Sequence, residues 1–157
     1  MSDNVLDHIP ALRVYSRALC GHGPDAEDLV QETLIRAIEY ASSYRSGTNM
    51  RAWLFTIMRN RFYSNVGKRG RESTGLTDCV SSLPHSPGQQ EWHLRGQELA
   101  RALDELPVHY REAIVLVVVL GESYAHASKH LDCDIGTVKS RVNRARNKLK
   151  HALGDSV

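Results

Sequence analysis

Cysteine is scarce in this 157-residue chain: Cys20, Cys79 and Cys133 lie far apart. An odd number of widely spaced cysteines fits neither a disulfide framework nor a paired-cysteine zinc site. No apolar run reaches the roughly 18 residues that a transmembrane helix needs, and the longest, residues 113–120, suits a buried helix. The acidic Asp3 and Asp7 stand where a secretory signal would be basic. We therefore expect reduced thiols, no membrane insertion and a cytoplasmic protein.

Enzyme motifs are also absent. The chain has no glycine-rich phosphate loop, no nucleophile motif and no paired carboxylates outside one acidic helix. His126 and His130 have the spacing of two ligands on one helix face, but no third ligand accompanies them, because Cys133 and Asp134 fall in the turn that follows. We predict neither an enzyme nor a metal ion or other cofactor.

Apolar residues recur every three or four positions through most of the chain, which predicts an all-α fold. The expected helices cover residues 6–20, 25–41 (with Asp25 as N-cap), about 50–71, 92–105, 108–120, 124–131 and 135–153. Periodicity stops between Glu72 and Glu91, where Ser, Pro and Gly accumulate. The sequence thus predicts two small helical domains, 1–71 and 92–157, joined by a flexible linker at 72–91.

The last two expected helices form a helix-turn-helix, the motif whose second helix enters the major groove of DNA. Ser123 suits the N-cap of the short helix, and Asp132 suits a left-handed turn. Residues 136–153 hold six Lys and Arg and no acid. A seam of Val138, Val142, Ala145 and Leu149 would direct a polar and basic face outward. A merely solvated basic surface is the alternative interpretation.

The first domain carries two charged features. An acidic stripe of Asp28, Gln31, Glu32 and Glu39 is interrupted by Ile35, which an isolated domain would not ordinarily leave in water. Between residues 59 and 71 five basic residues occur without an acid, interleaved with aromatic rings, which favours nucleic acid. A partner is expected on the stripe, although an ordinary solvated acidic face remains the alternative.

At residues 123–146 the sequence SYAHASKHLDCDIGTVKSRVNRAR resembles domain 4 of the sigma factors, which recognises the −35 promoter element. DAEDLVQETLIRA at 25–37 and RAWLFTIMRNRFYS at 51–64 resemble domain 2 of the extracytoplasmic-function (ECF) sigma factors. The segments GTNMRAWLFTIMRNRFYS and SYAHAS are similar in sequence to the general-stress-response branch of the ECF sigma factors. Ala127 and Ser128 depart from the family in giving the short helix less apolar volume.

The resemblance implies the partners core RNA polymerase, promoter DNA and an anti-sigma factor. The acidic stripe would dock on the clamp helices of the largest polymerase subunit through Asp28, Gln31 and Glu32. The loop at 43–49 and the adjoining helix would hold the −10 element through Ser46, Thr48, Asn49, Arg61 and Tyr63. The final helix would bind the −35 element through Thr137, Lys139, Ser140, Arg141, Arg144 and Lys148.

Two other functions fit parts of the sequence. A sigma mimic would keep the fold and bind an anti-sigma factor without initiating transcription, but it could lose the basic face that Lys139, Arg141, Arg144 and Arg146 provide here. A dimeric helix-turn-helix repressor would have no use for the acidic helix. An ECF sigma factor, directing transcription of stress-response genes, is the interpretation that uses every feature.

Overall fold

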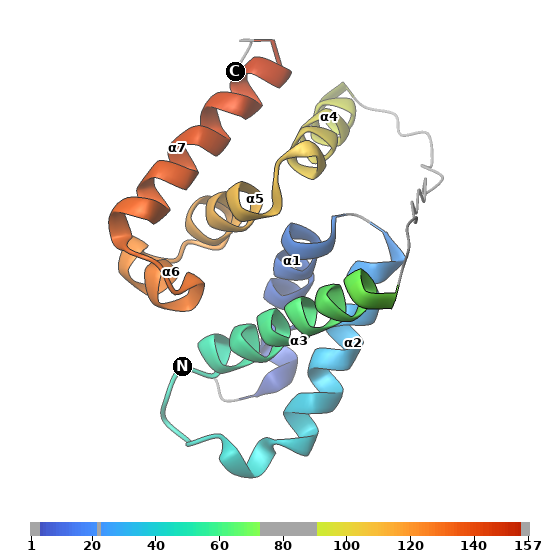
Figure 1. Ribbon diagram of the computed structural model, residues 1–157, viewed down its shortest axis with the longest axis vertical. Helices are drawn as coiled ribbons and strands as arrows, with labels where there is room; N and C mark the ends of the chain where they lie inside the picture. The colour runs from blue at the N-terminus through green and yellow to red at the C-terminus, as the bar shows by residue number, and fades with distance from the viewer. Residues whose placement is uncertain (1–3, 22, 73–90, 155–157) are drawn as a thin grey trace. The chain divides into compact units, whose positions relative to one another are not determined.

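The computed structural model describes residues 4–21, 23–72 and 91–154. The chain divides into two compact units, Met1–Ser82 and Leu83–Val157, and the described residues contain helices and loops but no strand (Figure 1). The all-α class is therefore confirmed. None of the described helices is long and apolar enough to cross a bilayer. Nearly all of the predicted linker, residues 73–90, lies outside the described part of the chain.

The first unit contains α1 (Ile9–Cys20), α2 (Pro24–Glu39) and α3 (Met50–Glu72), with 3₁₀ turns at Val5–His8 (η1) and Ala41–Ser43 (η2). The single helix expected over 6–20 is a 3₁₀ turn, η1, followed by the α-helix α1. Pro10 lacks a backbone N–H, which suits the first turn of a helix but not its interior, so the α-helix begins anew at Ile9.

The expected N-cap of α2 was wrong by two residues. Gly23 is the N-cap, at φ 151°, and Pro24 opens the helix without any side-chain cap. A proline in first position needs no hydrogen-bond partner for its nitrogen, and glycine tolerates this φ. Asp25 falls instead in the first turn with Glu27, where both carboxylates favour the helix dipole.

The core of the first unit is built around two aromatic rings. Tyr15 of α1 and Phe55 of α3 lie with centroids 4.6 Å apart and are almost wholly buried. Leu12, Leu54 and Met58 surround them with no exposed surface. Burying side chains of this size stabilises the unit by roughly 1.5–3 kcal/mol each, so this packing holds α1 against α3.

The second unit contains α4 (Glu91–Glu105), α5 (Val108–Ile114), the π-helical turn η3 (Val115–Val119), α6 (Tyr124–Leu131) and α7 (Ile135–Ala152). The single helix expected over 108–120 is thus an α-helix followed by a π turn, in which the Leu120 N–H donates to the Val115 carbonyl at 2.8 Å. Four of the five residues of η3 are valines, whose branched side chains crowd a regular helix.

The helix-turn-helix of α6 and α7 forms as the sequence predicts. The Ser123 hydroxyl accepts from the His126 N–H at 3.0 Å, and Asp132 adopts the left-handed conformation at φ 55°. In the predicted seam, Val138 and Val142 have at most 1% of their surface exposed, and Leu149 is half-buried. The seam fixes the rotation of α7, so its polar side faces outward.

A buried arginine joins α4 to α5. The Arg111 guanidinium is 8% exposed and donates to the carbonyl oxygens of Asp104 and Leu106 at 3.0 and 3.2 Å. Both acceptors belong to the end of α4 and the bend that follows, where helix carbonyls have no partner within the helix. Arg111 therefore fixes the direction in which α5 leaves this bend.

Candidate protein and nucleic-acid interfaces

One side of α2 carries a carboxylate and an amide beside two exposed apolar side chains. Asp28 and Gln31 are exposed, as predicted, and Ile35 and Ile38 follow at helical spacing with 58% and 77% of their surface exposed. Residues separated by three and four positions share a helix face. We call these four side chains the α2 face; two large apolar groups in water indicate a surface that a partner protein covers.

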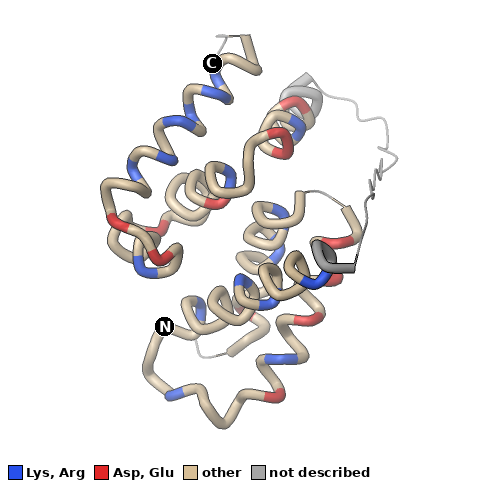
Figure 2. Tube along the Cα trace, viewed as in Figure 1, with Lys and Arg blue, Asp and Glu red and all other residues tan. Residues whose placement is uncertain are grey.

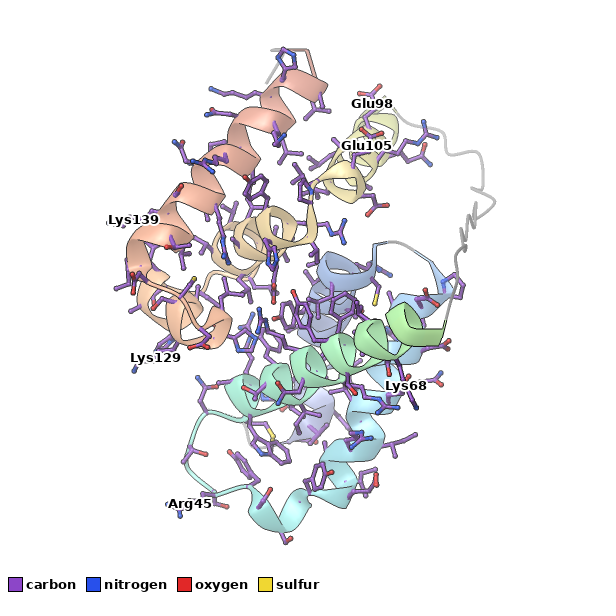
Figure 3. All side chains as sticks on the ribbon, viewed as in Figure 1. Arg45, Lys68, Glu98, Glu105, Lys129 and Lys139 are labelled. Carbon is purple, nitrogen blue, oxygen red and sulfur yellow. The ribbon has the colours of Figure 1, made fainter. Side chains whose placement is uncertain are left out.

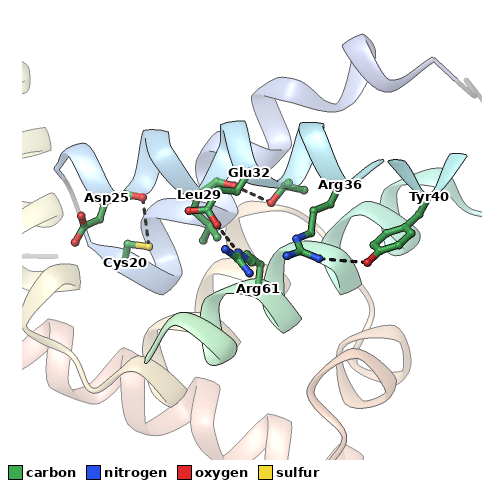
Figure 4. A network of polar contacts seen from close by, with 8 residues as sticks. Cys20, Asp25, Leu29, Glu32, Arg36, Tyr40 and Arg61 are labelled. Carbon is green, nitrogen blue, oxygen red and sulfur yellow. Dashed lines mark hydrogen bonds and ion pairs between the residues drawn. The ribbon is translucent and has the colours of Figure 1, made fainter. Parts of the chain in front are cut away.

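Glu32 differs from its neighbours because it is bound within the unit. Its Oε2 accepts from Nε of Arg61 on α3, and the two side chains are only 35% and 28% exposed (Figure 4). The hydrogen bond from Arg61 lowers the pKa of Glu32 below its ordinary value, against an opposing effect of partial burial. One predicted polymerase contact and one predicted −10 contact are thus partners of each other.

The loop between η2 and α3 exposes Ser46, Thr48 and Asn49, as a base-binding loop requires. The Asn49 side-chain oxygen accepts from the Ala52 N–H at 3.1 Å and so caps α3. The Tyr44 hydroxyl donates to the Thr48 carbonyl at 3.0 Å, and its ring lies 5.1 Å from that of Trp53. These contacts hold the loop in a defined shape while leaving polar atoms at its surface.

The five predicted −10 residues fall into two groups. Arg61 is twelve positions beyond Asn49, which corresponds to about 18 Å along a helix. Tyr63 is half-buried, and the guanidinium of Arg59 lies over its ring at 4.8 Å. The structure thus separates the loop residues from a second group, Arg61 and Tyr63, further along α3.

A groove beside Arg61 contains residues that the sequence analysis did not single out. Arg36 of α2 and Tyr40, the C-cap residue of that helix, are hydrogen-bonded at 3.3 Å and line it together with Asn60 and Ser64 of α3. Spacing along α3 could have indicated Asn60, because it lies four positions after the exposed Thr56 and so on the same side of the helix. The contribution from α2 depends on packing between helices and carries no local signal.

The exposed side of α7 is basic along its length, as the repeated Lys and Arg positions in Figure 2 show. Lys139, Ser140, Arg144 and Lys148 are exposed, and Thr137 and Arg141 are half-buried. All six predicted residues therefore reach the surface on this helix. Asn143, exposed between Ser140 and Arg144, was missed although an amide is a good reader of adenine edges.

Two contacts at the turn fix the first basic side chains of α7. Lys139, which Figure 3 labels on α7, has its ammonium group 5.5 Å from the ring centroid of Tyr124 at the start of α6. A guanidinium nitrogen of Arg141 lies 3.9 Å from the Cys133 sulfur in the turn itself. Lys139 therefore faces α6, whereas Arg141 and Arg144 lie toward the start of α5.

The described residues include no group of three His, Cys, Asp or Glu side chains placed to hold a metal ion. His126 is exposed on α6 and His130 is half-buried. The first unit thus has an exposed apolar helix face and an exposed polar loop at 43–49, and the second has a basic helix-turn-helix. This combination defines a transcription factor that binds both a protein and DNA.

Comparison with known proteins gives the family. The model of Sigma-70 region 2 matches residues 5–72 and that of Sigma-70, region 4, matches residues 96–149. The ECF sigma factor EcfG of Rhodopseudomonas palustris is 45% identical over 154 residues, covering 98% of this chain and 84% of that protein. The chain belongs to the ECF group of the sigma-70 family. It binds core RNA polymerase and directs promoter-specific initiation of transcription.

Solved structures agree with this assignment. The sigma factor RpoE from Bartonella quintana, in complex with the anti-sigma factor NepR, has a TM-score of 0.81 and 40% identity, with coverage of 98% of this chain and 96% of that one. The anti-anti-sigma factor PhyR of the same organism, complexed with NepR, has a TM-score of 0.59 and 17% identity over 94% of this chain and 49% of its own. The similarity to PhyR shows only a shared fold.

Proposed function

We propose that the two units divide promoter opening between them, the domain at 1–71 gripping polymerase and the −10 element and the domain at 92–157 binding the −35 element. The observation that carries this proposal is the opposite character of two exposed helix faces. The α2 face is apolar and carries one carboxylate, Asp28, while α7 carries only basic charge on its described residues. A protein partner suits the first face and a polyanion suits the second.

Polymerase docks on the α2 face, on the clamp helices of its largest subunit. Asp28 and Gln31 supply polar contacts, and Ile35 and Ile38 supply the apolar area that gives such an interface its affinity. Glu32 acts through Arg61, by holding α2 against α3, and offers its remaining exposed oxygen surface to the partner. Acidic charge on this face also speeds the encounter with a basic partner.

The loop at 43–49 holds an unpaired base of the −10 element. Ser46 and Thr48 are exposed, and Asn49 keeps its amide N–H groups for a base edge while its oxygen caps α3. Arg61 and Tyr63, further along α3, meet the strand that leads away from the flipped base. A loop already shaped by Tyr44 and Trp53 loses less entropy on binding.

The helix α7 lies in the major groove at the −35 element. Ser140 and Arg144 face outward and read base edges, and Lys148 contacts phosphate. Thr137, Lys139 and Arg141 stand at the N-terminal part of the helix, the part that reaches the bases in helix-turn-helix proteins. Arg is suited to this task because its planar fork binds guanine at two points.

An anti-sigma factor controls the protein, and its target promoters serve a general stress response. The likeness to RpoE bound to NepR and to EcfG supports both parts. The basic face of α7 favours initiation over the alternative of a mimic that binds only the anti-sigma factor.

The test is transcription in vitro by purified core polymerase on a library of promoter fragments from the source genome. The full chain is expected to produce transcripts from a small set of start sites. Asp28→Arg is expected to lose core binding in gel filtration with unchanged circular dichroism. A folded chain that neither binds core polymerase nor starts a transcript would contradict the proposal and leave the mimic.

A further inference from the structure

A surface groove of about 490 Å³ lies between α7 and the start of α5. Ser140, Arg141 and Arg144 form one wall, and His109 and Tyr110 of α5 form the other. Arg144, Ser140 and His109 are exposed, while Arg141 and Tyr110 are half-buried. The groove therefore joins the side chains proposed for the −35 element to two residues outside the helix-turn-helix.

The chemistry of this groove selects an anion. Two guanidinium groups, an imidazole, a phenol and a serine hydroxyl contribute hydrogen-bond donors, and no Asp or Glu is among the residues that line it. A guanidinium beside hydroxyl and imidazole donors is a common setting for phosphate oxygens. The groove is open to solvent along α7, so it accepts an extended chain and not only a small ion.

The position of the groove indicates which anion occupies it. A helix in the major groove of DNA is flanked by the two phosphate backbones, and the element beside it meets one of them. The start of α5 is that element, because it shares the groove with Ser140, Arg141 and Arg144. We propose that His109 and Tyr110 bind backbone phosphate of the duplex beside α7, which makes α5 a second DNA-binding element; this inference rests on the proposed role of α7.

The experiment measures binding of the full chain to a short DNA duplex by fluorescence anisotropy over a range of salt concentrations. His109→Lys adds a charge beside a phosphate, so it is expected to tighten binding about fivefold and to steepen the salt dependence by roughly 0.9 in log–log slope. His109→Glu is expected to weaken binding by at least as much. Tyr110→Phe, which keeps the ring, is expected to weaken binding about fivefold.

A matched series at His151 controls for the overall charge. His151 is an exposed histidine in the last turn of α7 and lines a different groove. His151→Lys and His151→Glu are expected to change affinity less than twofold. Equal effects at His109 and His151 would mean that the field of the protein, and no local contact, is responsible, and would overturn the inference.

Selection from a pool of random duplexes separates this inference from the proposed function. The His109 and Tyr110 variants are expected to enrich the same sequence as the parent chain, since a backbone contact carries no sequence information. Arg144→Ala is expected to enrich a relaxed sequence. If Arg144→Ala changes the selection but the His109 and Tyr110 variants bind like the parent, only this inference fails. If all of them match the parent, the role of α7 fails as well.

Discussion

Arg61 on α3 donates a hydrogen bond from its Nε to Oε2 of Glu32 on α2, which binds together two side chains that the family resemblance gives to different partners. Polymerase contacts are expected on α2 and DNA contacts on α3. A partner that moves Glu32 therefore also changes the position of Arg61. Substitution of either residue alters the packing of the unit as well as one interface, so a lost function there does not by itself identify a contact.

Glu32→Gln is expected to lower the stability of the first unit by about 1 kcal/mol at neutral pH. The pKa of Glu32 in the folded unit lies below its ordinary value of 4.5. The pair therefore contributes fully above pH 4.5, and its contribution is lost as the pH falls from that value through the lowered pKa. Urea unfolding at neutral and acidic pH measures both effects, with Trp92 replaced by Phe so that Trp53 reports on its own unit.

Arg13→Gln is the control for this measurement. Glu27 pairs with Arg13 at 3.6 Å, but the two side chains are 49% and 53% exposed. A pair this exposed contributes little in water, so its loss is expected to change stability by less than about 0.5 kcal/mol. Equal losses for both variants would show that Glu32 and Arg61 form an ordinary surface pair and do not tie α2 to α3.

Ile35→Ser is expected to weaken binding to core polymerase about tenfold, because an isoleucine that is 58% exposed in the free chain would be buried on docking. Removing an exposed side chain leaves the core of the unit intact, so its unfolding is expected to be unchanged. Binding is measured by fluorescence anisotropy of the labelled chain titrated with core enzyme. Leu6→Ser, at an apolar residue on η1 that is 67% exposed, provides the comparison. Unchanged binding of the Ile35 variant would remove the α2 face from the interface, and equal losses at both positions would mean that the loss is not specific to α2.

Arg111→Ala is expected to destabilise the second unit by about 2–4 kcal/mol, because the carbonyl oxygens of Asp104 and Leu106 would lose a buried donor. Amide hydrogen exchange at Val138 and Val142 measures this without interference from the other unit. A loss of 2 kcal/mol corresponds to exchange about 30-fold faster when closing outpaces the chemical exchange step, because the opening equilibrium then sets the rate. Arg101→Ala, at an exposed position on α4, is expected to leave exchange nearly unchanged. Unchanged exchange in the Arg111 variant would mean that the bend is held by other contacts.

Local signals account for what the sequence predicted well. Ser123 and Asp132 act on backbone atoms within a few residues, so the ends of α6 followed from the sequence alone. The start of α2 was misplaced because two local signals competed, and Gly23 followed by Pro24 prevailed over an acidic cap at Asp25. The π turn at η3 was missed because a run of valines has the same apolar pattern in either helix type.

The candidate site likewise contains residues that the sequence placed correctly and contacts that it could not predict. Periodicity was enough to place Ser140, Arg144 and Lys148 on the exposed side of α7, because the buried seam fixes the rotation of that helix. It could not predict that Glu32 pairs with Arg61, since the two lie on different helices. The groove that brings His109 to Arg144 likewise depends on how α5 packs against α7. Tertiary contacts of this kind leave no periodic trace in a single sequence.

Arg144→Ala and Lys148→Ala are expected to weaken DNA binding in different ways, although both side chains are exposed on α7. An arginine that reads a base contributes about 1–3 kcal/mol, so Arg144→Ala should weaken binding to the −35 sequence far more than to unrelated duplexes. A lysine on phosphate has no sequence preference, so Lys148→Ala should weaken binding to every duplex equally and reduce the salt slope by roughly 0.9. Anisotropy with promoter and scrambled duplexes at several salt concentrations measures both quantities. If both variants weaken binding to promoter and scrambled duplexes equally, both side chains contact phosphate. Base reading must then be assigned to other residues of α7.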